Sequence, residues 1–319
     1  MIDLKTENLL INKEVNENLE SILKRKAFSN GYIFYGPEGI GKKQTAMKFI
    51  MEIFNKYSSN SNIEKKIIDK NHPDFLLIEP TYFFKGNLIN RSEAEPTKNN
   101  KETIRIEQIR NLKTFLGQKS IESGGKIVLI DDAHLMNEAA SNCLLKTLEE
   151  PSNGIFILLT SRLNLLLDTI ISRCQLIRFK SFSHKQLEIF IRQNLDYSNF
   201  NVDEELNLKD LINSANGSPG KILSDLKVWN ELPSEIKDTL KSPLKDSLDI
   251  LKIAKMISEE LEIDQQIFLI NFIQNKWWGV TKNSNIVKKL ETMKSHLMGF
   301  IQPRLVWEVT LLKIAIQDL

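Results

Sequence analysis

The sequence has very few cysteines, and they cannot build a covalent or metal-bound framework. Of its 319 residues only Cys143 and Cys174 are cysteine. Two thiols cannot form a disulfide scaffold, and they are too few for a cysteine-rich zinc module. We therefore expect a protein of a reducing compartment such as the cytoplasm, without zinc.

Long apolar runs and a dominant charge are also missing. The most apolar stretch, residues 154–171, is interrupted by Arg162, Asn164 and Asp168, well before the roughly 20 apolar residues that a membrane-spanning helix needs. The first 15 residues mix Asp, Glu and Lys with apolar residues, unlike a signal peptide. The 43 basic and 41 acidic residues give a net charge of +2, which is no strong electrostatic footprint for nucleic acid. We expect no membrane partner, and DNA contacts only locally or through other proteins.

What the sequence contains is an alternation of short apolar runs and longer amphipathic stretches. Runs typical of strands occur at residues 32–35, 74–79, 126–131, 154–161 and 175–179. Between them, residues 42–57, 103–119 and 137–150 have apolar side chains at the spacings typical of helices. Asn137 is the expected N-cap of the third helix, and Pro151 follows its end. This alternation predicts an α/β domain with a mostly parallel sheet and helices on both faces.

The remaining segments are less regular. Residues 81–102 have no clear period, which predicts an insertion or a long loop. From about residue 182 the strand patterns stop and helical patterns follow. We therefore predict an α/β domain over residues 1–181, a small helical lid over 182–235 and a second helical domain over 236–319.

The stretch "GPEGIGKK", which begins at Gly36, has the spacing of a phosphate-binding loop between a predicted strand and a predicted helix. With Gly39 and Gly41 it would let backbone N–H groups face the phosphates, while Lys42 reaches the terminal ones. A Ser or Thr that ligates Mg²⁺ should follow, but this chain has Lys43, whose ammonium group has only donors and the charge sign of the metal. The loop either binds ATP or ADP with Mg²⁺ or merely connects two elements.

Two carboxylates follow a predicted buried strand in "KIVLIDDAH", namely Asp131 and Asp132. An Asp at the first position can hold Mg²⁺, and an acid at the second can activate the attacking water. A Glu is expected at the second position, and Asp132 is one methylene shorter, which places its carboxylate further from that water. Alternatively, Asp132 caps the next turn. Thr160 ends the next predicted strand and is expected at the same edge of the sheet.

Several stretches together resemble one family. They are the glycine loop, "NHPDFLLIEP", "IRIEQIRNLK", "KIVLIDDAHLMNEAASNCLLKTLEEPSNGIFILLTS", "TIISRCQLIRF" and "NGSPGK". Their order and spacing resemble the AAA+ clamp-loader subunits of bacteria, and most closely the delta-prime subunits of DNA polymerase III. The resemblance implies a RecA-like domain over 1–181, a three-helix lid over 182–235 and a helical collar over 236–319.

The resemblance also implies partners and a division of labour. Clamp-loader subunits of the gamma/tau and delta kinds would form a five-subunit ring with this chain, open the sliding clamp and place it on primer–template DNA. Delta-prime subunits usually lack a working ATP site, act as a rigid stator and supply an arginine finger to a neighbour. Lys43 and Asp132 are departures expected of such a subunit. Whether a nucleotide binds without turnover stays open.

Residue roles follow from the same resemblance. Arg173 in "SRC" would be the finger that acts in trans on a neighbour's ATP, or else an arginine that binds carbonyls at a helix C-terminus. Lys221 in "NGSPGK" stands where motor subunits carry a nucleotide-sensing Arg, and a Lys lacks the bidentate fork. The zinc-binding cysteines of many relatives are absent between residues 54 and 75, so His72 is expected to be a structural hydrogen-bonding residue.

Two rival functions remain. One is an active gamma/tau-type ATPase motor, which Lys43 and the missing zinc cysteines disfavour. The other is a free-standing P-loop switch or repair ATPase, which leaves the helical C-terminal region without a ring to build. Trp277, Trp278 and Trp307 are expected in the core or in a collar interface, with stacking on single-stranded bases as the alternative.

Overall fold

The computed structural model describes residues 12–25, 28–57, 62–84, 87–90, 102–149, 154–194, 208–299 and 301–317. The chain forms two compact units. The first comprises Met1–Ser183 together with Ser218–Gly220, and the second comprises His184–Gly217 and Lys221–Leu319. The predicted separation of a lid from a collar near residue 235 remains a prediction.

The first unit is built on a five-stranded parallel sheet. Its strands are β1 (Gly31–Tyr35), β2 (Phe75–Ile78), β5 (Lys126–Ile130), β6 (Gly154–Thr160) and β7 (Gln175–Arg178). They lie in the order β2-β5-β6-β1-β7, and every neighbouring pair is parallel. All residues of β5 are buried, as expected of a strand covered on both faces. The prediction of a mostly parallel α/β sheet is confirmed.

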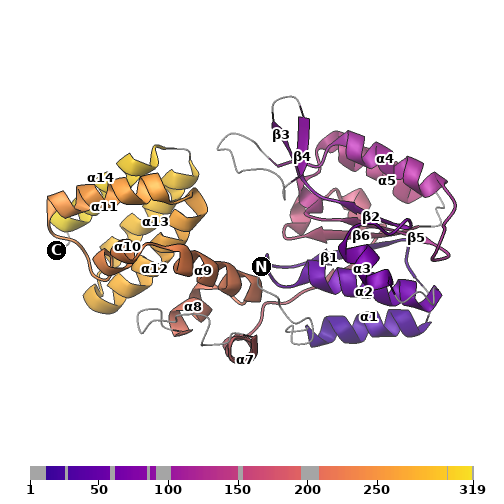
Figure 1. Ribbon diagram of the computed structural model, residues 1–319, viewed down its shortest axis with the longest axis horizontal. Helices are drawn as coiled ribbons and strands as arrows, with labels where there is room; N and C mark the ends of the chain where they lie inside the picture. The colour runs from indigo at the N-terminus through magenta and orange to yellow at the C-terminus, as the bar shows by residue number, and fades with distance from the viewer. Residues whose placement is uncertain are drawn as a thin grey trace. The chain divides into compact units, whose positions relative to one another are not determined.

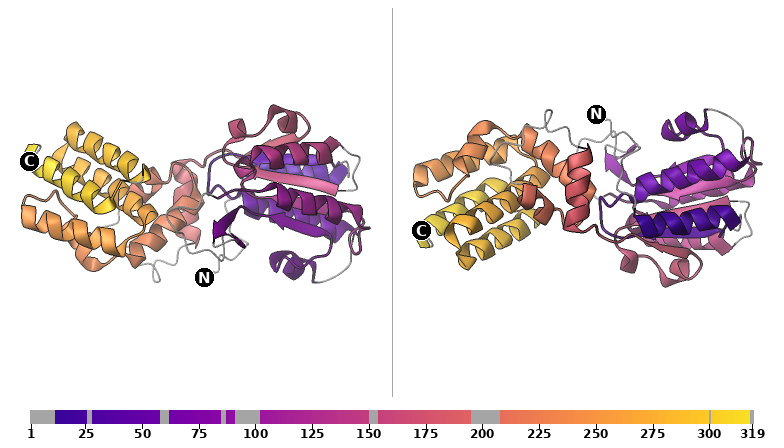
Figure 2. Two further views of the ribbon diagram at one scale, coloured as in Figure 1. Left: turned by 90° about the horizontal axis from the view of Figure 1, so that it is seen from above. Right: turned by 90° about the horizontal axis from the view of Figure 1, so that it is seen from below.

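Helices cover both faces of this sheet. Figure 1 shows α4 (Ile106–Gly117) and α5 (Glu138–Glu149) on one face, and α1 (Lys13–Arg25) and α2 (Lys42–Tyr57) on the other. The right view in Figure 2, seen from below, shows α1 and α2 side by side. The predicted N-cap of α5 is confirmed, because Asn137 Oδ1 accepts a hydrogen bond from the Ala140 N–H at 2.8 Å. Pro151 lies outside the described residues.

Two further features of this unit differ from the sequence prediction. Part of the predicted loop 81–102 is a hairpin, in which β3 (Thr81–Phe84) pairs antiparallel with β4 (Asn87–Asn90). The two short strands form a separate two-stranded sheet. No helix lies between them in the sequence, and the alternation of strands and helices identified only the strands of the main sheet. Residues 91–101 lie outside the described residues. Helix α1 was not predicted, although Val15, Leu19, Ile22 and Leu23 form its buried stripe.

The second unit is entirely helical within the described residues. Its elements are α7 (His184–Asn194), α8 (Leu208–Ser214), α9 (Pro219–Glu231), α10 (Ser234–Thr239), α11 (Ser247–Glu260), α12 (Ile263–Thr281), α13 (Ser284–Met298) and α14 (Pro303–Gln317). The first two residues of α9 are grouped with the first unit. Helix α14 packs against α11 and α13, and α12 packs against α13, which produces the yellow and orange bundle of Figure 2. No helix in the described part of the chain is long and apolar enough to cross a membrane.

Two of the three tryptophans singled out in the sequence belong to the core of this unit. Trp277 and Trp307 are fully buried. The Trp277 Nε1–H donates to the Leu240 carbonyl at 2.9 Å, and the Trp307 Nε1–H donates to Gln266 Oε1 at 2.9 Å. Core packing is therefore confirmed for both, and neither can stack on a base. Trp278 is 43% exposed.

A buried carboxylate fixes the amino-terminal edge of the sheet. Asp74 is fully buried just before β2, and its carboxylate accepts hydrogen bonds from the N–H groups of Ile121, Glu122 and Ser123 and from the Ser123 hydroxyl. Burial by itself raises the pKa of Asp74, but these donors outweigh it and hold the pKa below its usual value. The start of β2 is thereby tied to the loop that leads into β5.

We expect Asp74→Ala to lower the free energy of unfolding by about 3 kcal/mol, because several buried amides lose a charged acceptor. The native pKa lies below the unfolded value of about 3.9, so this contribution is complete at neutral pH and is lost as the pH falls through the native pKa. Urea unfolding of both proteins at neutral and acidic pH measures it. Ser120→Ala, which removes only a 3.3 Å hydrogen bond to Asp74, is the control. Equal stability of Asp74→Ala and wild type at neutral pH would refute the assignment.

Candidate functional site

The glycine loop between β1 and α2 retains the backbone shape of a phosphate cradle. Gly39 and Gly41 have φ angles of 69° and 92°, which side-chain-bearing residues rarely adopt. Gly36 is required for a different reason: a Cβ there would lie 2.3 Å from the Phe179 carbonyl oxygen. The three glycines identified in the sequence are therefore needed by the fold of the loop, whether or not it binds a nucleotide.

Lys42 contacts its own loop. Its ammonium group donates to the carbonyl oxygens of Gly36 at 2.9 Å and Pro37 at 2.6 Å. Burial lowers the pKa of Lys42, and the negative charges of Asp132, Glu38 and Asp131 oppose that shift without cancelling it. The lysine expected to bind a terminal phosphate thus contacts carbonyl oxygens of its own loop, and three carboxylates lie near enough to affect its pKa.

Lys43 bridges two carboxylates at the carboxyl edge of the sheet. Its Nζ lies 2.7 Å from Glu79 Oε1 and 2.8 Å from Asp131 Oδ2. These carboxylates follow β2 and β5, which are adjacent parallel strands, so their carboxyl ends bring both acids to one edge of the sheet. Burial opposes the charge of Lys43, but the hydrogen bonds to Asp131 and Glu79 outweigh it and raise the pKa of Lys43. An ammonium group therefore bridges the carboxylates that could otherwise share a divalent cation.

Glu79 is a site residue that the sequence analysis missed. Besides Lys43, it pairs with Lys70, whose Nζ lies 2.6 Å from Glu79 Oε2. Burial alone would raise the pKa of Glu79, but the two lysines lower it. Its signal was available, because an acidic residue ends the predicted strand 74–79, as Asp131 ends the strand 126–131.

Asp132 lies beside the glycine loop but does not cap a turn. It has left-handed backbone angles (φ 46°, ψ 48°) and precedes the 3-10 turn Ala133–Leu135, yet its side chain makes no capping hydrogen bond. The capping alternative is therefore wrong. Its own N–H donates to Asp131 Oδ1 at 3.1 Å, and its charge acts on both Lys42 and His134.

Thr160 lies at the same edge of the sheet, buried at the end of β6. Its hydroxyl accepts a hydrogen bond from the Arg162 N–H at 3.0 Å and lies 3.3 Å from His134 Nδ1. His134 is a second missed residue, and burial lowers its pKa. The sequence pattern did not indicate a role for His134, because the side chains around it come from three separate segments of the chain. The structure thus brings Lys42, Lys43, Asp131, Asp132 and Thr160 together at one edge.

Arg173 is not part of this cluster. It follows the short helix α6 (Asp168–Ile171). Its guanidinium donates to the Thr169 carbonyl at 2.9 Å and to Glu149 Oε1 at 2.7 Å. The carbonyl contact expected of an arginine at a helix C-terminus is therefore present. The side chain is still 38% exposed, so it remains accessible to solvent. A role in trans stays a prediction.

The "NGSPGK" stretch contacts the glycine loop directly. The Ser218 hydroxyl donates to the Glu38 carbonyl at 2.8 Å, and the Gly220 N–H donates to the Gly39 carbonyl at 2.9 Å. A Cβ on Gly220 would lie 2.7 Å from that carbonyl oxygen. Lys221 belongs to the second unit, where its ammonium group lies 2.7 Å from the buried Asp225.

His72, which was expected to have a structural role, contacts an aromatic ring and a backbone amide. His72 stacks on Phe54 with ring centroids 4.4 Å apart, and its Nδ1 accepts a hydrogen bond from the Asp74 N–H at 3.2 Å. This matches the expected structural role. Within the described residues, no group of three or more His, Cys, Asp or Glu side chains could hold a metal.

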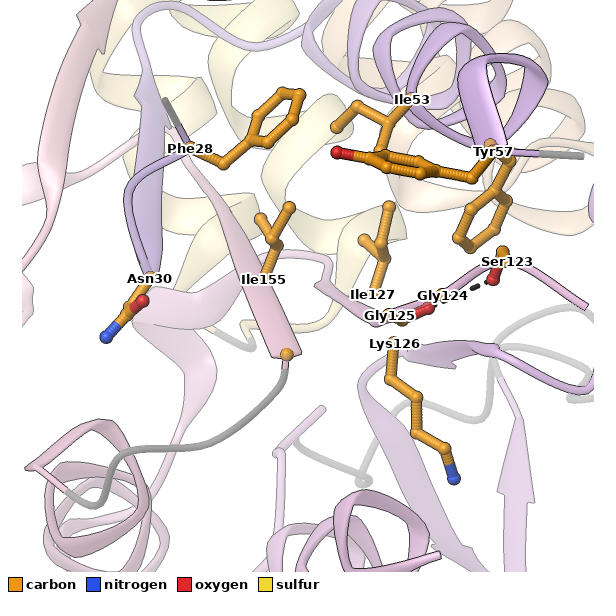
Figure 3. A pocket seen from close by; sticks show the side chains of 12 residues that line it. Phe28, Asn30, Ile53, Tyr57, Ser123, Gly124, Gly125, Lys126, Ile127 and Ile155 are labelled. Atoms are coloured by element: carbon orange, nitrogen blue, oxygen red, sulfur yellow. Dashed lines mark hydrogen bonds between the residues drawn. The ribbon is translucent and has the colours of Figure 1, made fainter. Parts of the chain in front are cut away.

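A cavity of about 240 Å³ lies at the opposite edge of the sheet, near the amino ends of β5 and β6. Figure 3 shows Phe28, Ile53 and Tyr57 around it, while the Lys126 side chain points away. None of its lining residues was predicted as a site residue. It contains no acidic side chain among the residues described around it.

Comparisons with known proteins identify relatives of both units. A family model described as "DNA polymerase III, delta subunit" matches residues 11–183, and one described as "Cyanobacterial DNA polymerase III delta prime, C-terminal domain" matches residues 191–314. The delta' subunit of Pseudomonas aeruginosa is 34% identical over 47% of this chain and 43% of its own length. That of Bacillus subtilis is 30% identical over 55% of this chain and 52% of its own length.

A motor-type relative and a solved structure are also similar. The tau subunit of Bacillus subtilis is 28% identical over 68% of this chain and 36% of its own length. The chain thus matches about half or less of the length of these curated relatives. A gamma subunit-related protein of Thermotoga maritima has a TM-score of 0.52 at 17% identity, covering 93% of this chain and 98% of its own. This likeness supports the fold alone.

We expect Lys43→Ala to create a divalent-cation site, because it leaves Glu79 and Asp131 facing each other without a shared cation. The variant should be less stable than wild type without metal and should regain stability as Mn²⁺ or Mg²⁺ is added, by about 1.4 kcal/mol at ten times the dissociation constant. Thermal unfolding against metal concentration measures this. Lys70→Ala is the matched control, since it removes a partner of Glu79 but keeps Lys43. An equal metal response in wild type would contradict the internal-cation interpretation.

Proposed function

Because the chain belongs to the DNA polymerase III delta-subunit family, we propose that it is a delta-prime subunit of a bacterial clamp loader and does not hydrolyse ATP itself. It would join gamma/tau and delta subunits in a five-subunit cytoplasmic ring that loads the sliding clamp onto primer–template DNA. The delta' relatives support the assignment. The observation that carries the loss of hydrolysis is Lys43 between Glu79 and Asp131.

This arrangement disfavours catalysis for two physical reasons. Phosphoryl transfer in this class of sites uses Mg²⁺ to bridge the β- and γ-phosphate oxygens, and the ammonium of Lys43 has no lone pair with which to ligate it. The same ammonium offsets part of the negative charge that would attract the metal. It also repels a cation at 4 Å by about 4 kcal/mol per unit charge at an effective dielectric constant of 20. The glycine loop can still offer backbone amides to an anion.

The same reasoning weighs against the rival functions. The similarity to a tau subunit makes an active ATPase motor the main alternative, but such a motor needs the hydroxyl ligand that Lys43 replaces. A free-standing P-loop ATPase would need it equally. A stator requires only a fixed loop, and the contacts of Ser218 and Gly220 with the loop carbonyls support such rigidity.

Arg173 is the residue through which the subunit would act on a neighbour. The Thr169 carbonyl fixes one edge of its guanidinium, while Glu149 occupies the other at a position that is 48% exposed. A phosphate group of a neighbouring subunit's ATP could replace Glu149, because it offers the same pair of oxygen acceptors with more charge. The helix-terminal contact and the finger role are therefore compatible.

We expect the isolated chain to show no ATP turnover above background, since Mg²⁺ lacks its hydroxyl ligand and Asp132 is short. Phosphate release measured for wild type and Lys42→Ala should be indistinguishable. Steady turnover that Lys42→Ala abolishes would show an active site and favour the motor alternative.

Arg173→Ala should leave folding and ring assembly nearly unchanged but lower the ATPase activity of a reconstituted loader. Loss of such a finger costs about 10³–10⁵ in rate at one dependent site. Total turnover would fall less, because only the site facing this subunit loses its arginine. Arg173→Lys should rescue poorly, since it keeps the charge without the fork.

The matched control is Arg192→Ala, which removes an exposed arginine paired with Glu188 within α7. Clamp- and DNA-stimulated ATPase activity and clamp loading would be measured for both variants. If Arg173→Ala matches wild type in both rates while the ring is intact, Arg173 is only a helix-terminal residue.

A further inference from the structure

The cavity at the amino-terminal edge of the sheet lies between the last turn of α2 and the starts of β5 and β6. Ile53 and Tyr57 are four residues apart on α2, so they share one face of the helix. Ile127 and Ile155 are partners in the parallel register of β5 and β6, and their side chains point toward the end of α2 (Figure 3). The cavity is therefore a slot between a helix and one face of the sheet, with a volume of about 240 Å³.

Glycines leave this space unfilled. Gly124, Gly125 and Gly154 line the cavity, and none of them has a side chain to place in it. Gly124 has a φ angle of 61°, which side-chain-bearing residues rarely adopt. A Cβ on Gly124 would lie 3.8 Å from Tyr57 Cδ1, which is an ordinary van der Waals contact. The backbone turn, and not crowding, therefore requires this glycine, and the slot beside the turn stays open.

The cavity offers no partner for an ionic group. Among the described lining residues the only charged one is Lys126, which is buried, points away from the cavity (Figure 3) and donates to the Phe115 carbonyl. The Ser123 hydroxyl is engaged by a buried carboxylate at 2.8 Å. The Asn30 side chain also points away, whereas the Tyr57 hydroxyl points across the cavity (Figure 3). A ligand would thus meet apolar walls and one hydroxyl group.

We propose that this cavity binds a small, neutral aromatic molecule of two fused rings. An engineered apolar cavity of about 150 Å³ holds benzene, so the volume found here fits about nine or ten non-hydrogen atoms. A flat ring suits a slot between a helix and a sheet, and its transfer from water to apolar walls is favourable. A polar group on the ring would form a hydrogen bond with the Tyr57 hydroxyl, whereas a charged ligand would be buried without a partner. This inference goes beyond the proposed function and does not depend on it.

Indole added to the full chain is the first test, because it is bicyclic, neutral and carries one N–H group. Phe54 lines the cavity and stacks on His72, so the imidazole NMR signals of His72 report on whether the cavity is occupied. Indole should shift these signals saturably, with a dissociation constant of about 0.1–1 mM for a ligand of this size. The signals of His134, His184 and His296 are internal controls, since none of these residues lines the cavity. No saturable shift of the His72 signals up to the solubility limit of indole would overturn the inference.

Filling the cavity tests whether indole binds inside it. Ile155→Trp should abolish the indole-induced shift of the His72 signals, because the larger side chain takes the space that indole needs. Ile121→Trp is the matched control, since Ile121 is 75% exposed and is not among the described lining residues. Circular dichroism verifies that both variants are folded. An undiminished shift in folded Ile155→Trp would place the binding elsewhere and overturn the inference.

The polar contact is tested without a change in the shape of the cavity. Tyr57→Phe should weaken indole binding about fivefold, as expected for one hydrogen bond, and should leave the binding of indene unchanged, because indene has the same shape without the N–H group. Tyr35→Phe, at the other end of β1 from the cavity, is the control. Benzoate and benzylammonium should not shift the His72 signals, since neither charge finds a partner. Equal affinity of Tyr57→Phe and wild type for indole, or binding of either ion as tight as that of indole, would overturn the chemistry proposed for the ligand.

Discussion

The contact between Lys43 and the carboxylates of Glu79 and Asp131 is the interaction on which the character of the N-terminal unit depends. It joins the first turn of α2 to the carboxyl ends of β2 and β5, three elements that a metal–nucleotide complex would otherwise bring together. A cation carried by the chain is always present at its site, so this edge of the sheet needs no ligand to be complete. The Lys43 contacts therefore hold the first turn of α2, which follows the glycine loop, at this edge of the sheet.

The amino-terminal ends of β2 and β5 are fixed by a different kind of interaction. Asp74 ties the start of β2 to the loop before β5 through backbone amides, whereas Lys43 ties their carboxyl ends through charge. In both cases the partners outweigh the desolvation of the ion, although Asp74 is fully buried and the Lys43 side chain is 41% exposed. The adjacent strands β2 and β5 are therefore fixed at both ends.

The sequence predicts the elements whose signal is local. Strands β1, β5 and β6 are continuous apolar runs because they are covered on both faces, and Asn137 marks the start of α5 by residue type alone. The hairpin β3–β4 gives no comparable signal, since its strands are short and form a two-stranded sheet of their own. At the site, Lys43 was recognised as a misfit in its motif. Glu79 ends a predicted strand and could have been singled out, but its pairing with Lys43 spans 36 residues and depends on the parallel order of the strands.

The attachment of Ser218 and Gly220 to the glycine loop differs in kind from these ionic ties. Both hydrogen bonds end on backbone carbonyls, and their donors are a hydroxyl and an amide, so no titrating group takes part. Ionic strength and pH, which modulate the lysine–carboxylate contacts, leave this attachment unaffected. The loop is thus held by two independent sets of contacts, of which only the ionic set depends on salt concentration and pH. A side chain at position 220 would clash with the Gly39 carbonyl oxygen and so disrupt the other set alone.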